Sequence, residues 1–200
     1  MSFLGKMHSR LIYTRRVNVL ASRLSKLLPP DARVLDVGCG DGMIDSLIMQ
    51  HRPDVSIIGI DVLVRDHTYI QVTAFDGRTI PYSTGRFDAV IFVDVLHHTD
   101  SPEILLREGK RVSRETIVLK DHIKDGILAG LTLQFMDWVG NAHHGVVLKY
   151  NYWTERQWRE MFAALDLAVQ EWDARIGLYP LPATWLFDRS LHFIAKLVQR

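Results

Sequence analysis

The sequence predicts an α/β fold built on a doubly wound, mostly parallel sheet. Short apolar segments alternate with amphipathic ones between residues 33 and 119, which is the order of successive βαβ units. The clearest apolar segment, residues 89–95, is continuous, as strands covered on both faces are. The first apolar segment leads directly into a glycine-rich turn at residues 38–42. A length of 200 residues favours one domain.

The first expected element is an amphipathic helix from Ser9 to Leu28, in which apolar residues recur at helical spacing. The prolines at positions 29 and 30 end it. Such a helix can serve as a lid over a pocket or pack on an edge of the sheet, and its pattern does not separate the two. Strands are then expected at residues 33–37, 55–60 and 69–73, with a helix at residues 43–51 between the first two.

The fourth expected strand, residues 89–95, is followed by a helix with Ser101 as its N-cap and Pro102 in its first position. A fifth strand is expected at residues 116–119. The last third departs from simple alternation. We expect an apolar helix at 125–139, a loop rich in His, Tyr and Asn at 140–153, a helix with Thr154 and Gln157 as its capping box, and strands at 167–172 and 191–198.

Composition narrows the class of protein. The formal net charge of +1 argues against a dedicated nucleic-acid binder, which usually carries a basic stripe. One cysteine excludes an intrachain disulfide and fits a reducing compartment. No apolar run approaches the roughly 20 residues that span a bilayer, and the start of the chain does not resemble a secretory signal. We therefore expect a cytoplasmic protein with no integral membrane segment; its oligomeric state is open.

The most informative motif is a strand that breaks into Gly-x-Gly-x-Gly, at Gly38, Gly40 and Gly42, and then opens a helix. Glycine permits positive φ and a close approach of backbone to ligand, and open parallel sheets bind nucleotides at this end of a strand. The dinucleotide fingerprint needs its third glycine one position later, where this chain has Met43. Cys39 lacks a partner motif for nucleophilic chemistry, and a small residue is simply required there.

Three acidic positions follow the glycine turn in order. Asp61 ends the second strand, where a carboxylate can accept hydrogen bonds from both hydroxyls of a ribose. Asp76, which precedes Gly77, follows the third strand and can accept from an adenine amino group, although Asp-Gly is also ordinary turn chemistry. Asp94 opens the polar ending of the fourth strand, residues 94–98.

Together these elements resemble the class I S-adenosylmethionine-dependent methyltransferases over residues 32–120. The resemblance implies a Rossmann-like sheet of seven strands with the last one antiparallel, and S-adenosylmethionine as cofactor, with S-adenosylhomocysteine as product. It places the methionine part of the cofactor at the turn, the ribose at Asp61 and the adenine near Asp76. The implied cofactor-binding residues are Asp36, Gly38, Cys39, Gly40, Gly42, Asp61, Val62, Asp76, Gly77, Asp94 and Val95.

The resemblance also divides the single domain, residues 1–200, into four parts. These are an N-terminal helical cap (1–30), a cofactor-binding half (31–120), a lid over the substrate after strand five (121–153), and a C-terminal helix with strands six and seven (154–200). The apolar and aromatic lid fits a pocket for a ring or an acyl chain. Its candidate substrate residues are Trp138, His144, Tyr150 and Tyr152, which could equally be packing residues.

The acceptor is expected to be a small molecule, aromatic, quinone-like or lipid-like. Enzymes that methylate exocyclic amines of nucleic-acid bases resemble one another in an Asn/Asp-Pro-Pro-aromatic motif directly after strand four. This chain has Asp94-Val95-Leu96-His97 at that place, with no proline. His97 or His98 is a candidate general base, with a hydrogen-bonded structural role as the alternative. A metal site joining His97, His122 and His144 is disfavoured, so no metal is expected. A cofactor-binding module without turnover and a nucleotide-dependent oxidoreductase are the alternative functions.

Overall fold

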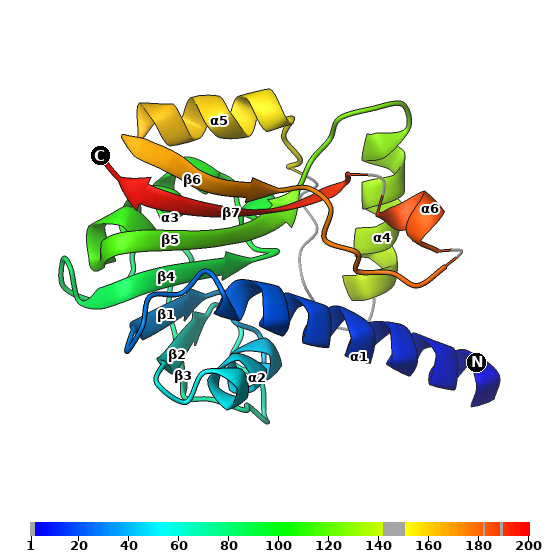
Figure 1. The fold of residues 1–200 in the computed structure, drawn as a ribbon, viewed down its shortest axis with the longest axis horizontal. Coiled ribbons are helices and arrows are strands. Elements are labelled where there is room, and N and C mark those ends of the chain that lie inside the picture. Colours follow the sequence, from blue (N-terminus) through cyan, green and yellow to red (C-terminus); the bar gives the residue numbers. More distant parts are fainter. Residues whose placement is uncertain (1–2, 142–150, 182, 189) are drawn as a thin grey trace.

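The computed structural model describes residues 3–141, 151–181, 183–188 and 190–200, with the side chains of 3–12, 137–141 and 186 left undescribed. Within these residues a seven-stranded sheet has the order β3-β2-β1-β4-β5-β7-β6 (Figure 1). Strands β1 to β5 are parallel, and β7 runs antiparallel to both β5 and β6. The strands are β1 (Arg33–Val37), β2 (Ser56–Asp61), β3 (Val72–Ala74), β4 (Phe87–Val93), β5 (Ser113–His122), β6 (Leu167–Asp173) and β7 (His192–Gln199).

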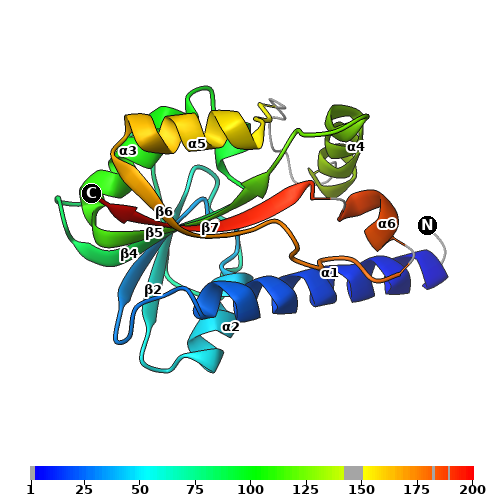
Figure 2. The same ribbon diagram turned by 45° about the horizontal axis from the view of Figure 1, so that its top comes forward.

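Helices cover both faces of the sheet, which confirms the predicted doubly wound α/β fold. In Figure 2, α3 and α5 lie on one face and α1 and α2 on the other. Helices α4 and α6 lie beside each other beyond the ends of β5 and β7 (Figure 1). The helices are α1 (Phe3–Ser25), α2 (Met43–His51), the short 3₁₀ helix η1 (Leu96–His98), α3 (Pro102–Val112), α4 (Ala129–Asn141), α5 (Glu155–Ala164) and α6 (Thr184–Phe187).

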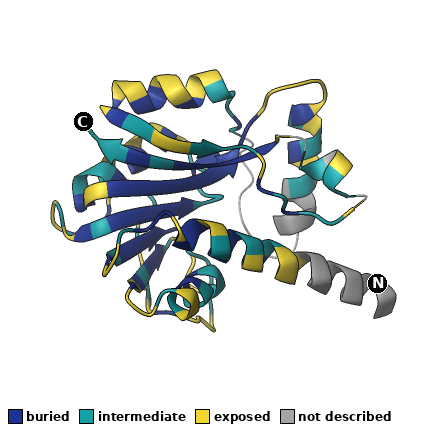
Figure 3. Ribbon diagram, in the orientation of Figure 1, coloured by how far each residue is buried: buried dark blue, intermediate teal, exposed yellow. Residues whose placement is uncertain are grey.

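The core has two halves because successive strand residues face opposite sides of the sheet. In β4, Ala89 and Ile91 belong to the half beneath α1 and α2, whereas Val90 and Phe92 belong to the half beneath α3 and α5. The central strands are buried almost throughout, as Figure 3 shows in dark blue. A sheet buried on both faces explains why the sequence shows continuous apolar runs there.

Some element boundaries differ from the sequence-based prediction for identifiable reasons. The apolar helix after β5 was expected from residue 125, but α4 begins at Ala129, because Gly126 and Leu128 both have positive φ. The third strand is only Val72–Ala74, since the preceding Tyr69 is exposed and donates its backbone N–H to Asp41. Ser101 precedes Pro102 at the start of α3 but makes no side-chain capping bond.

Other local predictions are confirmed. Thr154 and Gln157 form the capping box at the start of α5, with both reciprocal bonds present. The apolar face of α1 is buried against α2 and the sheet through Leu20, Ala21 and Leu24. No helix in the described ranges is both long and apolar enough to cross a membrane.

Candidate functional site

The glycine turn between β1 and α2 has the backbone conformation that its sequence predicts. Gly38, Gly40 and Gly42 all have positive φ, between 61° and 79°. A side chain added at Gly38 would lie 2.5 Å from Val95, so this glycine lets two loops meet. A Cβ added at Gly40, by contrast, would meet nothing within 4 Å. The turn therefore presents bare backbone to open space, as a ligand cradle requires.

Asp61 ties the end of β2 to this cradle. Its Oδ2 accepts a hydrogen bond of 2.8 Å from the backbone N–H of Gly40, and its Oδ1 accepts one of 2.8 Å from Leu63. Each carboxylate oxygen has two lone pairs, so both retain acceptor capacity for a ribose hydroxyl. The predicted ribose-binding acid is thus in place beside the turn.

The predicted adenine-side residues also lie together at this edge. A Cβ on Gly77 would lie 3.0 Å from Val62, so the loops after β2 and β3 touch. Val62 is 64% exposed, which is unusual for valine and leaves its side chain open to a planar ring. Asp76 accepts backbone hydrogen bonds from Thr79 and Arg78, and these bonds lower its pKa.

Asp94 begins the segment that follows β4 and lies next to Gly38 through its neighbour Val95. Its φ of +57° is in the left-handed region, which a non-glycine residue enters at a cost of about 1 kcal/mol or more. Its two carboxylate oxygens form ion pairs with different cations, Oδ1 with Lys120 of β5 and Oδ2 with Arg16 of α1. Burial would raise the pKa of Asp94, but the charges of Lys120 and Arg16 hold it well below its usual range.

A buried acid pair lies behind the turn. Asp36 of β1 and Asp45 of α2 are 2% and 1% exposed. Burial raises the pKa of Asp45 to about 7, and burial together with Asp45 raises that of Asp36 well above its ordinary range. At least one of the two is therefore protonated at neutral pH. Burial also raises the pKa of the Cys39 thiol, which faces Gly59 of β2, so Cys39 is a neutral packing group.

Beyond Asp94, a histidine and an aspartate form a fully buried dyad. Nδ1 of His97 lies 2.6 Å from Oδ1 of Asp121, and both side chains are 0% exposed. Asp121 also accepts backbone hydrogen bonds from His122 (2.7 Å) and Leu96 (3.1 Å). Burial would raise the pKa of Asp121, but its contacts with His97 and His122 lower it instead. An ionised Asp121 makes Nδ1 of His97 the protonated ring nitrogen.

The network continues through Lys120 to His192 of β7. Lys120 is 0% exposed and its Nζ lies 3.3 Å from Nδ1 of His192, whose Nε2 lies 3.1 Å from the carbonyl oxygen of Phe187. Nε2 therefore carries the hydrogen and Nδ1 accepts from Lys120. Burial, reinforced by Lys120, holds the pKa of His192 well below its ordinary value. Burial also lowers the pKa of Lys120, with Asp94 opposing that shift.

Four groups of this network are close enough to share a cation. One ligand atom each from Asp94, His97, Asp121 and His122 lies within 4.8 Å of the others in the described part of the chain. The metal site weighed from the sequence joined two of these histidines, His97 and His122, with His144, which lies outside the described residues. Asp94 already pairs with two cations, the ammonium of Lys120 and the guanidinium of Arg16, and Asp121 is held by His97. This charge balance favours a hydrogen-bonded network, and the absence of a metal stays a prediction.

The candidate substrate residues are only partly described. Tyr152 is 6% exposed and packs with Leu133 and Leu191, and its ring stacks on His97 at 5.6 Å. This burial favours the packing role that the sequence left open. Trp138 lies in α4, but its side chain is not described, and His144 and Tyr150 lie outside the described residues.

His98 is partly buried, with its ring 3.9 Å from that of His97. Several polar residues of the site were not recognised in the sequence, namely Arg16, Asp45, Lys120 and His192. Arg16 and His192 come from opposite ends of the chain, so no local spacing links them. Lys120, in contrast, carried a usable signal, because a lysine is unusual in an apolar strand.

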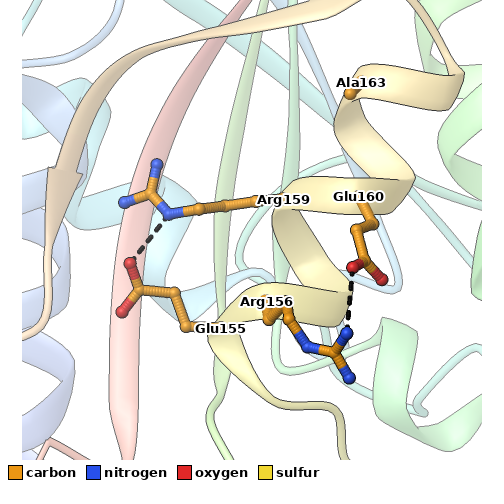
Figure 4. Close-up of a pocket in the computed structure, with 5 residues that line it drawn as sticks. All are labelled: Glu155, Arg156, Arg159, Glu160 and Ala163. Atoms are coloured by element: carbon orange, nitrogen blue, oxygen red, sulfur yellow. Dashed lines mark hydrogen bonds and ion pairs between the residues drawn. The ribbon is translucent and has the colours of Figure 1, made fainter.

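A shallow hollow lies on α5 (Figure 4). It is lined by Ala163 and by two ion pairs along the helix, Glu155 with Arg159 and Arg156 with Glu160. Such pairs stabilise a solvated helix face and carry no further chemistry.

Comparison with known proteins gives the family. The pattern of the methyltransferase domain family matches residues 9–171, and the chain belongs to that family. Its fold is similar to that of an S-adenosylmethionine-dependent methyltransferase of Mesorhizobium loti, which superposes with a TM-score of 0.65 over 89% of this chain and 96% of its own, at 18% identity. The PH0226 protein of Pyrococcus horikoshii OT3 superposes with a TM-score of 0.68 over 94% of this chain and 91% of its own, at 16% identity. The predicted fold and the predicted family are both confirmed.

Two curated relatives act on different acceptors. A malonyl-[acyl-carrier protein] O-methyltransferase of Herminiimonas arsenicoxydans is 34% identical over 100 residues, 46% of this chain and 38% of that protein. A tRNA (carboxymethyluridine(34)-5-O)-methyltransferase of Schizosaccharomyces pombe is 26% identical over 111 residues, 54% of this chain and 44% of that protein. The chain thus spans less than half the length of these relatives.

Proposed function

We propose that the chain transfers a methyl group from S-adenosylmethionine to a small-molecule acceptor. The observation that carries this proposal is the hydrogen bond from Gly40 to Asp61 beneath open space at the edge of the sheet. The bare backbone of the turn and the acid beside it fit the methionine part and the ribose of S-adenosylmethionine. Membership of the methyltransferase domain family implies the same cofactor.

The residues present fit that cofactor in the order the sequence implied. The glycine turn would hold its methionine part, with Asp36 and Cys39 supporting the turn from behind, Asp61 would hold its ribose, and Val62, Asp76 and Gly77 would lie beside its adenine. Asp94 and Val95 would lie beside the methionine part, at the contact of Val95 with Gly38. When bound, S-adenosylmethionine supplies an electrophilic methyl group. The protein then has to align the acceptor with that group and exclude water.

A small acceptor of aromatic, quinone-like or lipid-like character is supported by two observations. The formal net charge of +1 does not provide the excess of cations that binds a nucleic-acid backbone. Exposed apolar side chains on and just before α4 offer surface to an apolar molecule, namely Ile127, Leu128, Leu131 and Phe135. The tRNA-methylating relative makes an RNA acceptor the competing candidate.

For the proton that an acceptor must lose, we propose His97 as general base, with Asp121 orienting it. Because Nδ1 is committed to Asp121, Nε2 is the nitrogen that would accept the proton. His97 is fully buried beneath Tyr152, so the acceptor reaches it only if that cover moves. His98 is the alternative base, since it follows the same strand.

The experiment is calorimetric titration with S-adenosylhomocysteine and NAD side by side, followed by a screen of acceptors for release of S-adenosylhomocysteine. Binding of S-adenosylhomocysteine alone, with turnover on a small apolar acceptor, is the expected result. Binding of NAD alone would overturn the cofactor in favour of an oxidoreductase. Turnover on tRNA transcripts and on no small molecule would overturn the acceptor class. Cofactor binding with no turnover on either would favour a binding module.

A further inference from the structure

We propose that one end of the molecule binds the surface of an anionic lipid bilayer. This end, which we call the apolar end, consists of residues 124–136 and 175–187, with 182 excluded, and holds α6 and most of α4. Its exposed apolar side chains enter the interface of the bilayer, and the cations around them contact lipid phosphates. The inference goes beyond the proposed function, because such binding needs neither cofactor nor methyl transfer.

Two segments without a charged residue meet at the apolar end. They are residues 126–136 and 176–187, which are far apart in the sequence. They meet because α4 and α6 contact each other beyond the ends of β5 and β7 (Figure 1). Large apolar side chains of both segments are exposed, with Ile127 at 90% and Trp185 at 71%, and they include Leu128, Leu131, Phe135 and Leu181. Single exposed apolar residues are ordinary, whereas a group of them marks an interaction surface.

Helix α4 is apolar on two sides, and the fold buries one of them. Ala129 and Leu133 are four residues apart and are buried in a cluster with Tyr152. Leu131 and Phe135 repeat at the same spacing on another side and are exposed. A helix that is apolar all round is typical of complete burial. The outward side of α4 is therefore suited to a second apolar surface outside the chain.

Cations border the apolar end. Lys124 and Arg175 lie just before the two uncharged segments, and both are exposed. Arg15 of α1 is exposed as well, and its guanidinium donates a 3.3 Å hydrogen bond to the carbonyl oxygen of Gly177. Residues 1–30 contain six Lys and Arg and no Asp or Glu, although the whole chain has a net charge of +1. The N-terminal half of α1 runs past the loop that leads into α6 (Figures 1 and 2), so this basic segment borders the apolar end.

Two carboxylates that flank the uncharged segments are held by hydrogen bonds within the protein. Oδ2 of Asp125 accepts a 2.9 Å bond from the backbone N–H of Glu155. Oδ2 of Asp188 accepts a 2.7 Å bond from the hydroxyl of Thr184. Within the described residues neither carboxylate forms an ion pair with the bordering lysine and arginines, so these cations remain available to lipid phosphates.

Charge and apolar character together favour a lipid surface over other occupants. A second copy bound about a two-fold axis would bring the same cations together, which is unfavourable. A nucleic acid would use the cations but not the apolar side chains. An anionic bilayer offers phosphates at its surface and acyl chains beneath them, and its interface is where tryptophan is enriched.

The apolar end is continuous with the cover of the proposed site. Leu133, on the inner side of α4, packs with Tyr152, and the ring of Tyr152 stacks on His97. A chain bound to lipid through the outer side of α4 therefore holds this cover at the bilayer surface, where an apolar acceptor concentrates.

Sedimentation of the full chain with lipid vesicles, without cofactor, tests the inference. We expect vesicles of equal parts phosphatidylcholine and phosphatidylglycerol to bind the chain about tenfold or more tightly than vesicles of phosphatidylcholine alone, with binding that weakens as salt is added. The double variant Ile127→Ser/Leu131→Ser should bind the mixed vesicles about tenfold or more weakly. The double variant Lys124→Ala/Arg175→Ala should lose about fivefold per cation on the mixed vesicles.

The matched controls are Ile104→Ser and Arg107→Ala, which alter an exposed isoleucine and an exposed arginine of α3. Both should bind the mixed vesicles as the unmodified chain does. Failure of the unmodified chain to bind the mixed vesicles, or equal losses in Ile104→Ser and the apolar double variant, would overturn the inference. A dimer in analytical ultracentrifugation that the apolar double variant loses, with no vesicle binding, would assign this face to a second copy instead. Binding of S-adenosylhomocysteine, measured separately, decides the proposed function whichever result the vesicles give.

Discussion

The backbone N–H of Gly40 donates a 2.8 Å hydrogen bond to the carboxylate of Asp61, and this contact joins the turn after β1 to the end of β2. The two residues are far apart in sequence but adjacent in the sheet, because β1 and β2 pair in parallel with Val37 opposite Ile60. One bond thereby couples the proposed methionine and ribose subsites. The first two predictions test its two ends.

Asp61→Ala should weaken S-adenosylhomocysteine binding by about tenfold or more. The change removes a charge-assisted acceptor for the ribose, each such bond being worth roughly 1.5–3 kcal/mol. Asp61→Asn should lose less affinity for S-adenosylhomocysteine, since its amide oxygen can still accept the hydrogen bond from the backbone N–H of Gly40. Calorimetry measures both, with the exposed Asp66→Ala as control. An unchanged dissociation constant in Asp61→Ala would refute the ribose assignment.

Gly40→Ala should abolish or strongly weaken S-adenosylhomocysteine binding, because its Cβ would project into the open space above the turn. The variant Gly177→Ala is the control for backbone strain, since Gly177 also has a positive φ and open space around its Cβ position. Both substitutions should lower the melting temperature to a similar, modest degree. Equal cofactor binding by the two variants would show that the turn is not the cofactor site.

Asp45→Asn should stabilise the protein, and more so at pH 8 than at pH 5. The folded chain keeps Asp45 protonated up to about pH 7, whereas the unfolded chain ionises it near its ordinary value of 3.8. Stability is therefore lost as the pH rises between these values and is level above them. Urea unfolding at several pH values measures this. Asp36, whose pKa is also raised, leaves part of the pH dependence in the variant. A variant with the unmodified pH profile would contradict the assignment.

Asp121→Asn should lower kcat by about a hundredfold or more on an acceptor found by the screen, while cofactor affinity stays within about threefold. An asparagine in place of the ionised carboxylate no longer fixes the ring nitrogens of His97 in the roles that the base requires. The substitution His97→Asn should lower kcat by at least the same factor, and His98→Asn should lower kcat less. A larger loss from His98→Asn would identify His98 as the base.

Tyr152→Ala should cost roughly 3–5 kcal/mol of stability, as truncation of a buried aromatic side chain does. The ring packs with Leu133 and Leu191 and against the rings of His97 and His122. Tyr152→Phe keeps that packing and should melt near the unmodified temperature. A near-normal melting temperature for Tyr152→Ala, together with a raised Michaelis constant for the acceptor, would instead support the substrate role.

Features that depend on neighbours along the chain were predictable from the sequence alone. Gly38, Gly40 and Gly42 adopt positive φ because the turn between a strand and a helix demands it, and Thr154 caps its helix through Gln157 three residues away. Continuous apolar runs identified the central strands because both of their faces are covered. These local rules were enough to give the fold class and the position of Asp61 at the end of β2, and the resemblance of the ordered motifs to a known family gave the family.

Which distant charges meet, in contrast, depends on how the elements pack in three dimensions. Arg16 comes from α1, Asp94 from the end of β4, and Lys120 from β5. They meet because β4 and β5 pair in parallel while α1 packs on α2. The position of His192 beside Lys120 follows from the antiparallel register of β7. Buried charges must find partners wherever the fold supplies them, and sequence spacing does not encode those distances. The physical reason is that pairing in space is set by strand order and register, which local pattern leaves open.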